Sequence, residues 1–338
     1  MVRFTVLASG SKGNCTVVTG GRTRILVDAG LSCRELFRRM RLAGEEPATL
    51  NAIVVTHEHQ DHVGGLAVTA RNLGIPVYFT EGTHRAWMRW LNPRRQMTYA
   101  QWLEQCRKQA AERQAEAETI QSDAEGDPDE ADLMVDSGPV LTENLETAAT
   151  PAEKGVADLA PATPSREKDP TSLPAVEYFQ AGQLFEIGDI AVSPFTIPHD
   201  AADPVGFVFR AEGVRMAFAT DLGYIPPNVK AQLNGVDLLL LESNHDLEML
   251  RDGPYPWQVK QRVLSRVGHL SNEAAAQFLE NGYDGQAAYV ILAHLSESNN
   301  LPELARVTAE RALNGRASLL ANRVLLAAQH EPLLPIYF

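Results

Sequence analysis

The sequence predicts an α/β fold in which two packed β-sheets carry helices on their outer faces. Short apolar runs typical of strands open each half of the chain and then alternate with amphipathic helical segments. Several of these runs are apolar throughout, so we expect the sheet to be buried on both faces. An acidic segment with few large apolar side chains separates the two halves.

The first half begins with strands. Residues 4–9, 15–20 and 22–30 have the alternating, β-branched character of strands separated by glycine-rich turns. Ser32 and Glu35 then form a capping box, which predicts the start of a helix.

The rest of the first half alternates between strand and helix. Residues 51–56 predict a short strand that is buried on both faces. A helix over 65–74, a strand over 75–80 and a helix over 82–92 are expected to follow.

The second half repeats this order from Val176 onward, with strands first and helices later. The predicted strands are 176–198 (more than one strand), 203–213, 214–221, 236–243, 288–296 and a last one near the C-terminus; the predicted helices are 228–235, 256–267, 271–282 and 301–315.

The segment between the halves differs in composition. We predict a polar helix over 98–118 and a disordered insertion over 119–172, which has too little apolar surface to offset its chain entropy. Residues 1–97 and 173–338 are therefore expected to form two parts of one domain. The insertion is either a flexible surface loop, or a tail that binds a protein partner or mimics the charge of DNA.

The charge of the chain is concentrated in this insertion. Residues 118–172 hold fourteen acidic and three basic residues, whereas the whole chain has a net charge of −13. The acidity therefore does not exclude a nucleic-acid substrate for the remainder.

Location and cysteine content agree with a cytosolic protein. No run approaches the length of a membrane span, and residues 1–15 lack the features of a signal peptide. Cys15, Cys33 and Cys106 are scattered, so we expect reduced, structural cysteines. Any metal is then held by nitrogen and oxygen.

A cluster of metal-binding residue types follows the strand over 51–56. His57, His59, Asp61 and His62 stand in the pattern H-x-H-x-D-H. Two histidines two apart on extended chain point the same way, so both can bind one cation. The Asp-His pair lies in the next turn and faces a second position. Mixed imidazole and carboxylate ligands suit Zn²⁺, Mn²⁺ or Fe.

Three later residues end apolar strands and can meet this cluster. They are His199, Asp221 and His294. Each alone is more simply read as a turn or capping residue. Together with the first cluster, they favour a dinuclear metal site.

The motifs resemble those of the metallo-β-lactamase superfamily of dinuclear hydrolases. The shared stretches are "LVDAG", "THEHQDH", "IPHD", "ATD" and "LAHLS". More narrowly, "LASGSKGNC", "LLLESNHD", "GPYPWQVKQRVLSRVGHLSNEAA" and "LAHLSESNN" resemble the YycJ/WalJ-like branch, described as bacterial 5′ to 3′ exonucleases acting on double-stranded DNA. The acidic insertion departs from the compact pattern of that branch.

The resemblance implies a metallo-β-lactamase-like αββα four-layer sandwich and a role for each residue. A first metal would be held by His57, His59 and His199, and a second by Asp61, His62 and His294. Asp221 would bridge the two metals. Asp28, in "LVDAG", would orient ligands without touching a metal, unless it is only a turn residue.

Two divalent cations, Zn or Mn with Fe as a further option, lower the pKa of a bridging water and produce hydroxide at neutral pH. Asp61 could also orient that water or accept its proton. His269 is a candidate general acid or phosphate-binding residue, since it resembles a histidine in related phosphodiesterases. Glu242 is a candidate to orient His269. The simpler alternative is a His269 bonded to backbone at a helix start.

Four residues are candidates for phosphate binding. Lys12 and Asn14 lie in the glycine-rich stretch "SGSKGN", which otherwise reads as a simple turn. Lys260 and Arg262 precede His269, and Arg262 shares a helical face with Arg266. A solvated helix face explains that segment equally well.

Three functions remain open from the sequence. The first is a dinuclear nuclease or phosphodiesterase, with DNA as the expected nucleic-acid substrate. The second is a metallo-hydrolase of a lactone, thioester or other small ester. The third is a non-catalytic metal-binding module. The native metal, the exonuclease polarity and the oligomeric state do not follow from the residues.

Overall fold

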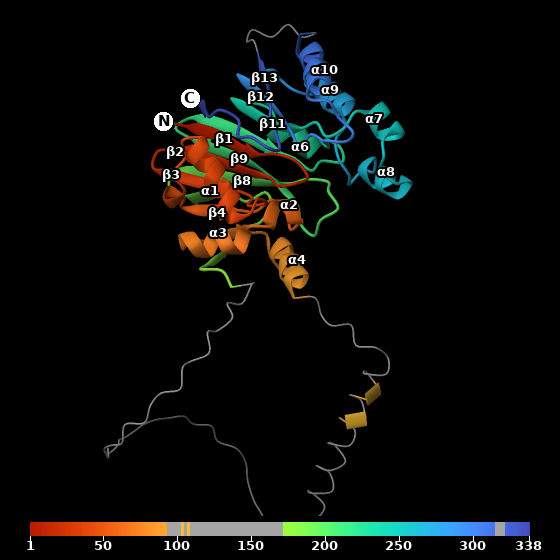
Figure 1. Cartoon of the computed structure of the whole chain (residues 1–338). Coiled ribbons are helices and arrows are strands. Elements are labelled where there is room, and N and C mark those ends of the chain that lie inside the picture. The colour runs from red at the N-terminus through yellow and green to blue at the C-terminus, as the bar shows by residue number, and fades with distance from the viewer. Residues whose placement is uncertain (93–102, 105–106, 109–171, 315–321) are drawn as a thin grey trace, which may run out of the picture. The chain divides into compact units, whose positions relative to one another are not determined.

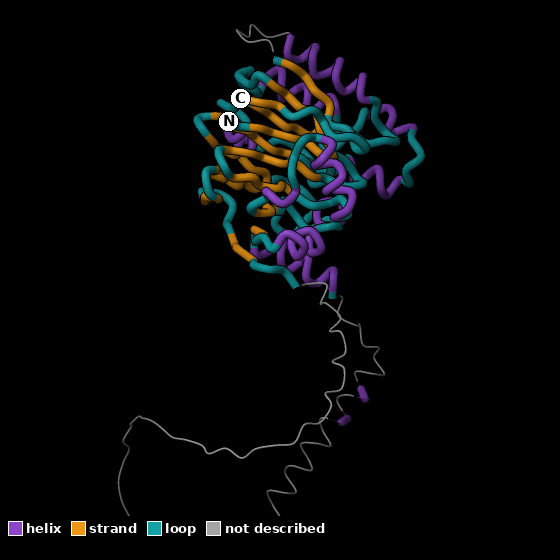
Figure 2. Tube along the Cα trace, turned by 60° about the vertical axis from the view of Figure 1, so that its left-hand side comes forward, coloured by secondary structure: helices purple, strands orange, loops and turns teal. Residues whose placement is uncertain are grey.

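In the computed structural model, residues 1–92, 103–104, 107–108, 172–314 and 322–338 are described. Two seven-stranded sheets form the inner layers, and helices lie on their outer faces (Figure 1). The same layers are visible with strands in orange between purple helices in Figure 2. The predicted αββα four-layer sandwich is confirmed.

The first sheet has the strand order β14-β1-β2-β3-β4-β5-β6. Strands β14 to β3 pair antiparallel, and β3 to β6 pair parallel. The strands are β1 (Arg3–Ala8), β2 (Cys15–Gly20), β3 (Thr23–Val27), β4 (Ala52–Val54), β5 (Val77–Phe79), β6 (Val176–Tyr178) and β14 (Ile336–Tyr337).

The second sheet repeats this arrangement, with the order β13-β12-β11-β10-β9-β8-β7. Strands β7 to β10 pair antiparallel, and β10 to β13 pair parallel. The strands are β7 (Phe185–Ile187), β8 (Ile190–Thr196), β9 (Val205–Ala211), β10 (Val214–Ala219), β11 (Leu238–Glu242), β12 (Tyr289–Ala293) and β13 (Arg323–Leu326).

Helices bury the outer face of each sheet. On the first sheet they are α1 (Cys33–Leu42), α3 (Leu66–Leu73) and α4 (Glu81–Leu91), and on the second α6 (Pro227–Gln232), α9 (Asn272–Asn281) and α10 (Pro302–Asn314). The shorter helices are η1 (Pro47–Thr49), α2 (Gln60–Val63), α7 (Leu247–Asp252) and α8 (Trp257–Val263).

Strand β11 shows why its sequence is apolar throughout. Leu238 and Leu240 lie in the core between the sheets, whereas Leu239 and Leu241 pack against the helices of the outer layer. Side chains alternate along a strand, so both faces need apolar residues when both are covered. Burying each leucine stabilises the fold by about 1.5–3 kcal/mol.

The predicted helix start at Ser32 is confirmed, because the Ser32 side chain accepts a hydrogen bond from the backbone N–H of Glu35 at 3.4 Å. The predicted helix over 256–267 is too long, since α8 ends at Val263. The chain turns back there: the N–H of Gly268 bonds to Ser265, and a Cβ on Gly268 would lie 2.2 Å from the Val263 carbonyl oxygen. Arg266 therefore does not share a helical face with Arg262.

Two further differences concern short elements. The single strand predicted near the C-terminus is two strands, β13 and β14, which belong to different sheets. Helix α7 was not predicted from the sequence, because its six residues are too few for a helical period to stand out.

The free cysteines agree with the sequence analysis. Cys15 and Cys33 are buried thiols without a disulfide, and burial raises the pKa of Cys15 to about 12. Cys106 lies outside the described residues. No helix in the described ranges is both long and apolar enough to span a lipid bilayer.

The strands on either side of the insertion are neighbours in one sheet. Strand β5 pairs with β6 in parallel, with Val77 opposite Val176. The predicted disordered insertion over 119–172 lies outside the described residues, except for residue 172, and so does the predicted helix over 98–118, except for residues 103–104 and 107–108.

We therefore expect a chain that lacks residues 119–172 to fold. The β5–β6 pairing does not involve those residues. A shorter connection between the two strands lowers the entropic cost of bringing them together by about 1 kcal/mol. Thermal unfolding followed by circular dichroism should give a cooperative transition at the same or a slightly higher temperature. Loss of that transition would show that the deleted residues are part of the folded core.

Candidate metal centre

Five strands of the two sheets end at the same side of the molecule, and a polar side chain lies at each end. His57 follows β4 in the first sheet. In the second sheet His199 follows β8, Asp221 follows β10, Glu242 ends β11 and His294 follows β12. The strand ends thus bring together residues that are more than 230 positions apart in the sequence.

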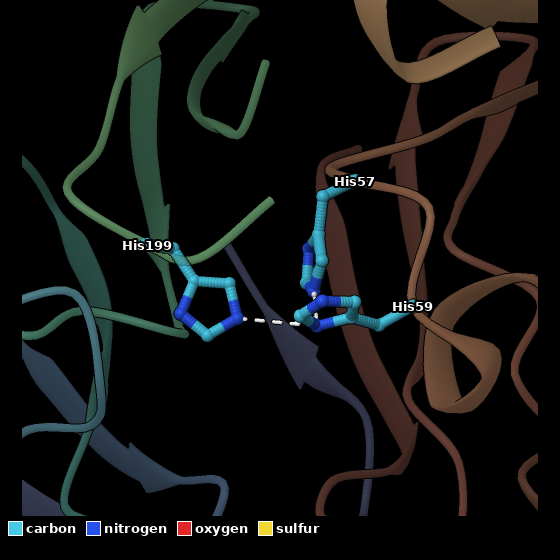
Figure 3. Close-up of side chains that lie close together, drawn as sticks. All are labelled: His57, His59 and His199. Atoms are coloured by element: carbon cyan, nitrogen blue, oxygen red, sulfur yellow. Dashed lines mark hydrogen bonds between the residues drawn. The ribbon is translucent and has the colours of Figure 1, made fainter. Parts of the chain in front are cut away.

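Three histidines converge in one part of this site (Figure 3). His57 and His59 extend from the loop before α2, and His199 reaches toward them from the loop after β8. His59 Nδ1 lies 3.1 Å from His57 Nε2 and 3.2 Å from His199 Nε2. A ring nitrogen can donate only one proton, so hydrogen bonds cannot satisfy all three atoms. A cation shared by the three lone pairs can.

A second group lies beside the first. His294 Nε2 is 3.4 Å from Asp61 Oδ2, and His62 Nε2 is 3.5 Å from the same oxygen. His62 and Asp61 belong to α2, whereas His294 comes from the second sheet. These are one carboxylate and two imidazoles, a donor set that suits Zn²⁺ or Mn²⁺.

Asp221 lies between the two groups. Its Oδ2 is 3.4 Å from His62 Nε2, and its Oδ1 is 3.9 Å from His199 Nε2. The side chain is buried, and Oδ2 accepts no hydrogen bond from any residue that the structure describes. A buried carboxylate oxygen without a donor is costly unless a cation neutralises it.

The backbone is strained at Asp221 and His294, and also at Asp28, which follows β3. Among the described residues, four that are not glycine have a left-handed φ: Asp28 at 59°, Asp221 at 61°, His294 at 57° and Glu212 at 49°. Each such residue costs of order 1–3 kcal/mol, so it persists where the surroundings require it. In the first three, the strain turns a side chain at a strand end into the site.

Asp28 supports the cluster without joining it. Its Oδ2 accepts a hydrogen bond from His62 Nδ1 at 2.8 Å and from Thr56 Oγ1 at 2.9 Å, and its Oδ1 accepts from the Thr56 N–H at 2.8 Å. The Nδ1 of His62 is thereby occupied, which leaves Nε2 to face Asp61 and Asp221. Burial raises the pKa of Asp28, and the His62 contact opposes that rise.

Glu242 connects the cluster to His269. Its Oε1 lies 2.8 Å from His269 Nδ1 and 3.0 Å from His294 Nδ1. Its Oε2 accepts hydrogen bonds from the N–H groups of Leu222 and Leu270. The carboxylate is fully buried, whereas 20% of the His269 side chain is exposed. His269 is therefore held at the rim of the cluster, where solvent can reach it.

A family model described as the metallo-beta-lactamase superfamily matches residues 8–257, well over half of the chain. The chain belongs to the metallo-β-lactamase superfamily. The matched region contains the H-x-H-x-D-H cluster, His199, Asp221 and Glu242.

Curated relatives place the chain in a narrower branch of that superfamily. It is 31% identical to exodeoxyribonuclease YycJ of Bacillus anthracis over 312 residues, and this match covers 92% of this chain and 89% of the relative. It is 29% identical over 306 residues to exodeoxyribonuclease WalJ of Streptococcus pneumoniae, which covers 90% and 86%. The chain belongs to the YycJ/WalJ branch, as the sequence motifs predicted.

Solved structures share the fold at low sequence identity. The metallo-β-lactamase fold protein YhfI from Bacillus subtilis is 13% identical, with a TM-score of 0.55 over 98% of both chains. A diphosphatase of the PhnP family is 15% identical, with a TM-score of 0.55 over 100% of this chain and 98% of that one. These similarities support the αββα architecture of the superfamily.

The chain is thus a metal-dependent hydrolase with the metallo-β-lactamase fold. The superfamily implies divalent metal ions, and the converging nitrogens of His57, His59 and His199 fit that implication. So does the buried Asp221 oxygen that has no donor. The predicted enzyme class is confirmed.

The electrostatics of the cluster show how its own groups balance. Burial lowers the pKa of His62, but the carboxylates of Asp221, Asp61 and Asp28 outweigh burial and raise the pKa to about 9. Burial raises the pKa of Asp221, yet the surrounding histidines, His294 foremost, hold it well below its usual range. The pKa values of His62 and His294 are both raised, so protons on these two rings balance the carboxylates, and a binding cation would have to displace them.

Two of the predicted phosphate-binding residues lie on the loop after β1. The Asn14 side chain is buried, with Nδ2 3.0 Å from His62 Nε2, so it lies next to the cluster. Lys12 is exposed, and its Nζ is 2.6 Å from Glu297 Oε2. Their role in phosphate binding stays a prediction.

The other two lie on α8. Lys260 Nζ donates to the carbonyl of Arg251 at 2.7 Å, and Arg262 Nε donates to Asp200 Oδ2 at 2.5 Å. Asp200 is next to His199, so Arg262 is connected to the metal cluster through one residue.

Several residues of the site were not found from the sequence. Asp200, the residue after His199 in "IPHD", has its Oδ1 3.4 Å from His199 Nε2. Asn244 donates to the carbonyl of His294, and Ser9 accepts from its N–H. Asn and Ser are common in loops, so nothing in their pattern indicated this role.

His245 is a further buried histidine, and its ring lies just before α7. Burial lowers the pKa of His245 to about 4.

Replacing Asp221 by Asn should remove bound metal. Asparagine has nearly the same shape and tolerates a left-handed φ, so the change removes charge with little strain. We expect the affinity for Mn²⁺ or Zn²⁺ to fall by more than the about 10- to 100-fold typical of losing a ligand-orienting partner. Elemental analysis of protein after desalting measures the metal per chain.

Glu212 provides a matched control for this substitution. It is also acidic and has a left-handed φ, but its carboxylate contacts the N-terminal amine of Met1 and no residue of the cluster. Glu212→Gln should retain its metal. A full complement of metal in Asp221→Asn would contradict the prediction.

Proposed function

We propose that this chain is a nuclease that hydrolyses phosphodiester bonds in DNA, acting as a 5′ to 3′ exonuclease. The observation that carries the proposal is the Glu242–His269 pair at the rim of the cluster. A phosphodiester has a poor leaving group that needs a proton, and this pair can supply one. The relatives named exodeoxyribonucleases match the chain over about nine-tenths of its length.

We infer the following metal ligands. His57, His59 and His199 would hold one divalent cation, Asp61, His62 and His294 a second, and Asp221 would contact both. Zn²⁺ and Mn²⁺ suit this nitrogen and oxygen donor set, and Fe is a further option. Such a pair of cations supplies Lewis-acid chemistry, which activates water and neutralises charge at the attacked phosphorus.

The role of His269 follows from its partner. Burial lowers the pKa of His269, but the charge of Glu242 and its hydrogen bond outweigh this effect and raise the pKa above its usual value. Glu242 therefore favours the protonated form of the ring. Glu242 accepts from Nδ1, so Nε2 remains to donate to the departing oxygen.

Asp61 and Asp28 have supporting roles in this proposal. Asp61 lies partly exposed beside His62 and His294, so its carboxylate could also orient the attacking water or take its proton. Asp28 fixes the ring of His62 and keeps its Nε2 directed inward.

Residues 119–172 have a separate place in the proposal. Residues 1–97 and 173–338 form one hydrolase domain in this proposal. The acidic insertion is either a flexible surface loop, or a tail that binds a protein partner or mimics the charge of DNA. A cytosolic location also stays a prediction from the sequence.

The activity can be tested with end-labelled substrates. Protein supplied with Mn²⁺ should release labelled mononucleotide early from a linear duplex labelled at the 5′ end, and should leave covalently closed circular DNA intact. A bulky biotin–streptavidin block on the 5′ end should stop the reaction, whereas a 3′ block should not. Cleavage of a lactone, with no cleavage of DNA or RNA, would overturn the proposal.

His269→Gln should separate metal binding from catalysis. We expect unchanged metal content and a turnover on DNA that is about 10²- to 10⁴-fold lower. The loss should be smaller on bis-p-nitrophenyl phosphate, because p-nitrophenolate departs without a proton. Steady-state rates on both substrates test this difference.

His330 provides the control for this experiment. Its side chain is exposed and contacts Glu297 at the surface. His330→Gln should behave as the wild type on both substrates. An equal loss of rate on DNA and on the nitrophenyl ester in His269→Gln would refute the general-acid role.

A further inference from the structure

Helix α8 is exposed to an unusual degree. Every other α-helix labelled in Figure 1 has at least one buried residue, but α8 has none, and it lies away from both sheets. Trp257 on α8 is 65% exposed, and Leu264 and Val267 in the turn after it are 50% and 44% exposed. Core packing therefore does not explain these apolar side chains. Apolar side chains gathered on a surface commonly mark a binding site.

The C-terminal end of this segment is attached to the metal centre. The Gly268 carbonyl lies 3.2 Å from His199 Nδ1, and the Val267 carbonyl accepts a hydrogen bond from the N–H of Asp200 at 3.0 Å. The N–H of His269 bonds to the Val263 carbonyl at 2.9 Å. The turn that follows α8 therefore lies directly beside His199 and His269.

The charge of this segment is opposite to that of the chain. Residues 253–272 contain Lys260, Arg262 and Arg266 and no acidic residue, whereas the whole chain has 43 acidic and 30 basic residues. A basic surface beside the cluster attracts phosphates. Arg262 is partly neutralised by Asp200, so Lys260 and Arg266 are the cations better placed to bind a ligand.

Aromatic side chains accompany these cations. The Arg266 guanidinium lies 4.5 Å from the centre of the Tyr224 ring, which is 37% exposed. Trp257 and Lys260 are three residues apart on α8, so they lie on one face of the helix. Aromatic rings combined with cations are the usual means of binding single-stranded nucleic acid, through stacking of bases and pairing with phosphates.

We propose that α8 and the following turn, residues 257–268, form a binding surface for the single-stranded end of the nucleic acid that enters the metal centre. Trp257 stacks on a base, and Lys260 and Arg266 pair with backbone phosphates. The charge of the segment and its continuity with His269 favour this occupant over a protein. The inference rests on the proposed nuclease function and adds where the strand binds.

Trp257→Ala tests the surface directly. The specificity constant kcat/KM is measured on a 5′-phosphorylated single-stranded oligonucleotide and on bis-p-nitrophenyl phosphate, which is too small to span from α8 to the metals. The ratio of the two constants should fall about 10-fold, mainly through KM, as expected for losing one stacked base.

Lys260→Gln and Arg266→Gln should each reduce the salt dependence of kcat/KM for the oligonucleotide. The slope of log kcat/KM against log salt concentration should be smaller by about 0.7 in each variant.

Trp90 provides a matched control. It is a tryptophan in helix α4, 51% exposed, and it takes no part in the proposed surface. Trp90→Ala should leave the ratio of constants as in the wild type.

The remaining outcomes separate this inference from the proposed function. A wild-type ratio in Trp257→Ala, with DNA still cleaved, would overturn the binding surface and leave the nuclease function standing. A wild-type ratio together with a changed oligomeric state in gel filtration would overturn it in favour of a second copy of the chain. If the wild-type protein cleaves no nucleic acid, the nuclease function fails and this inference fails with it.

Discussion

The centre of this molecule depends on an electrostatic constraint: its buried imidazoles and carboxylates cannot satisfy one another by hydrogen bonds alone. His59 Nδ1 faces two other ring nitrogens within 3.2 Å, and Asp221 Oδ2 accepts no hydrogen bond from the described residues. Burial makes both situations unfavourable, and a divalent cation relieves both. The stacked sheets supply the rigid frame that holds these groups together.

The two sheets make different contributions to the site. The loop after β4 in the first sheet supplies the H-x-H-x-D-H cluster, and the strand ends of the second sheet supply His199, Asp221 and His294. Glu242 connects the cluster to His269, since one of its oxygens contacts both His294 and His269. A shift of β11 would therefore displace both histidines at once.

The sequence predicted the parts of the molecule that follow from periodicity and residue type. Strands such as β11 were evident because two-sided burial requires a continuous apolar run, and the metal cluster was evident because three histidines stand within six positions. Positions set by tertiary packing could not be predicted in this way. The end of α8 depends on the close approach of Gly268 to Val263, which no local pattern encodes. Asp200 and Asn244 reach the site only because their strand ends meet there.

The spread of the site along the chain has a consequence for its synthesis. His57 leaves the ribosome early, whereas His294 follows β12 near the end of the chain. Domains fold as units once enough of their chain has emerged. A nascent polypeptide therefore cannot assemble the complete centre until nearly all of it is available, and a truncated product that ends before β12 lacks His294.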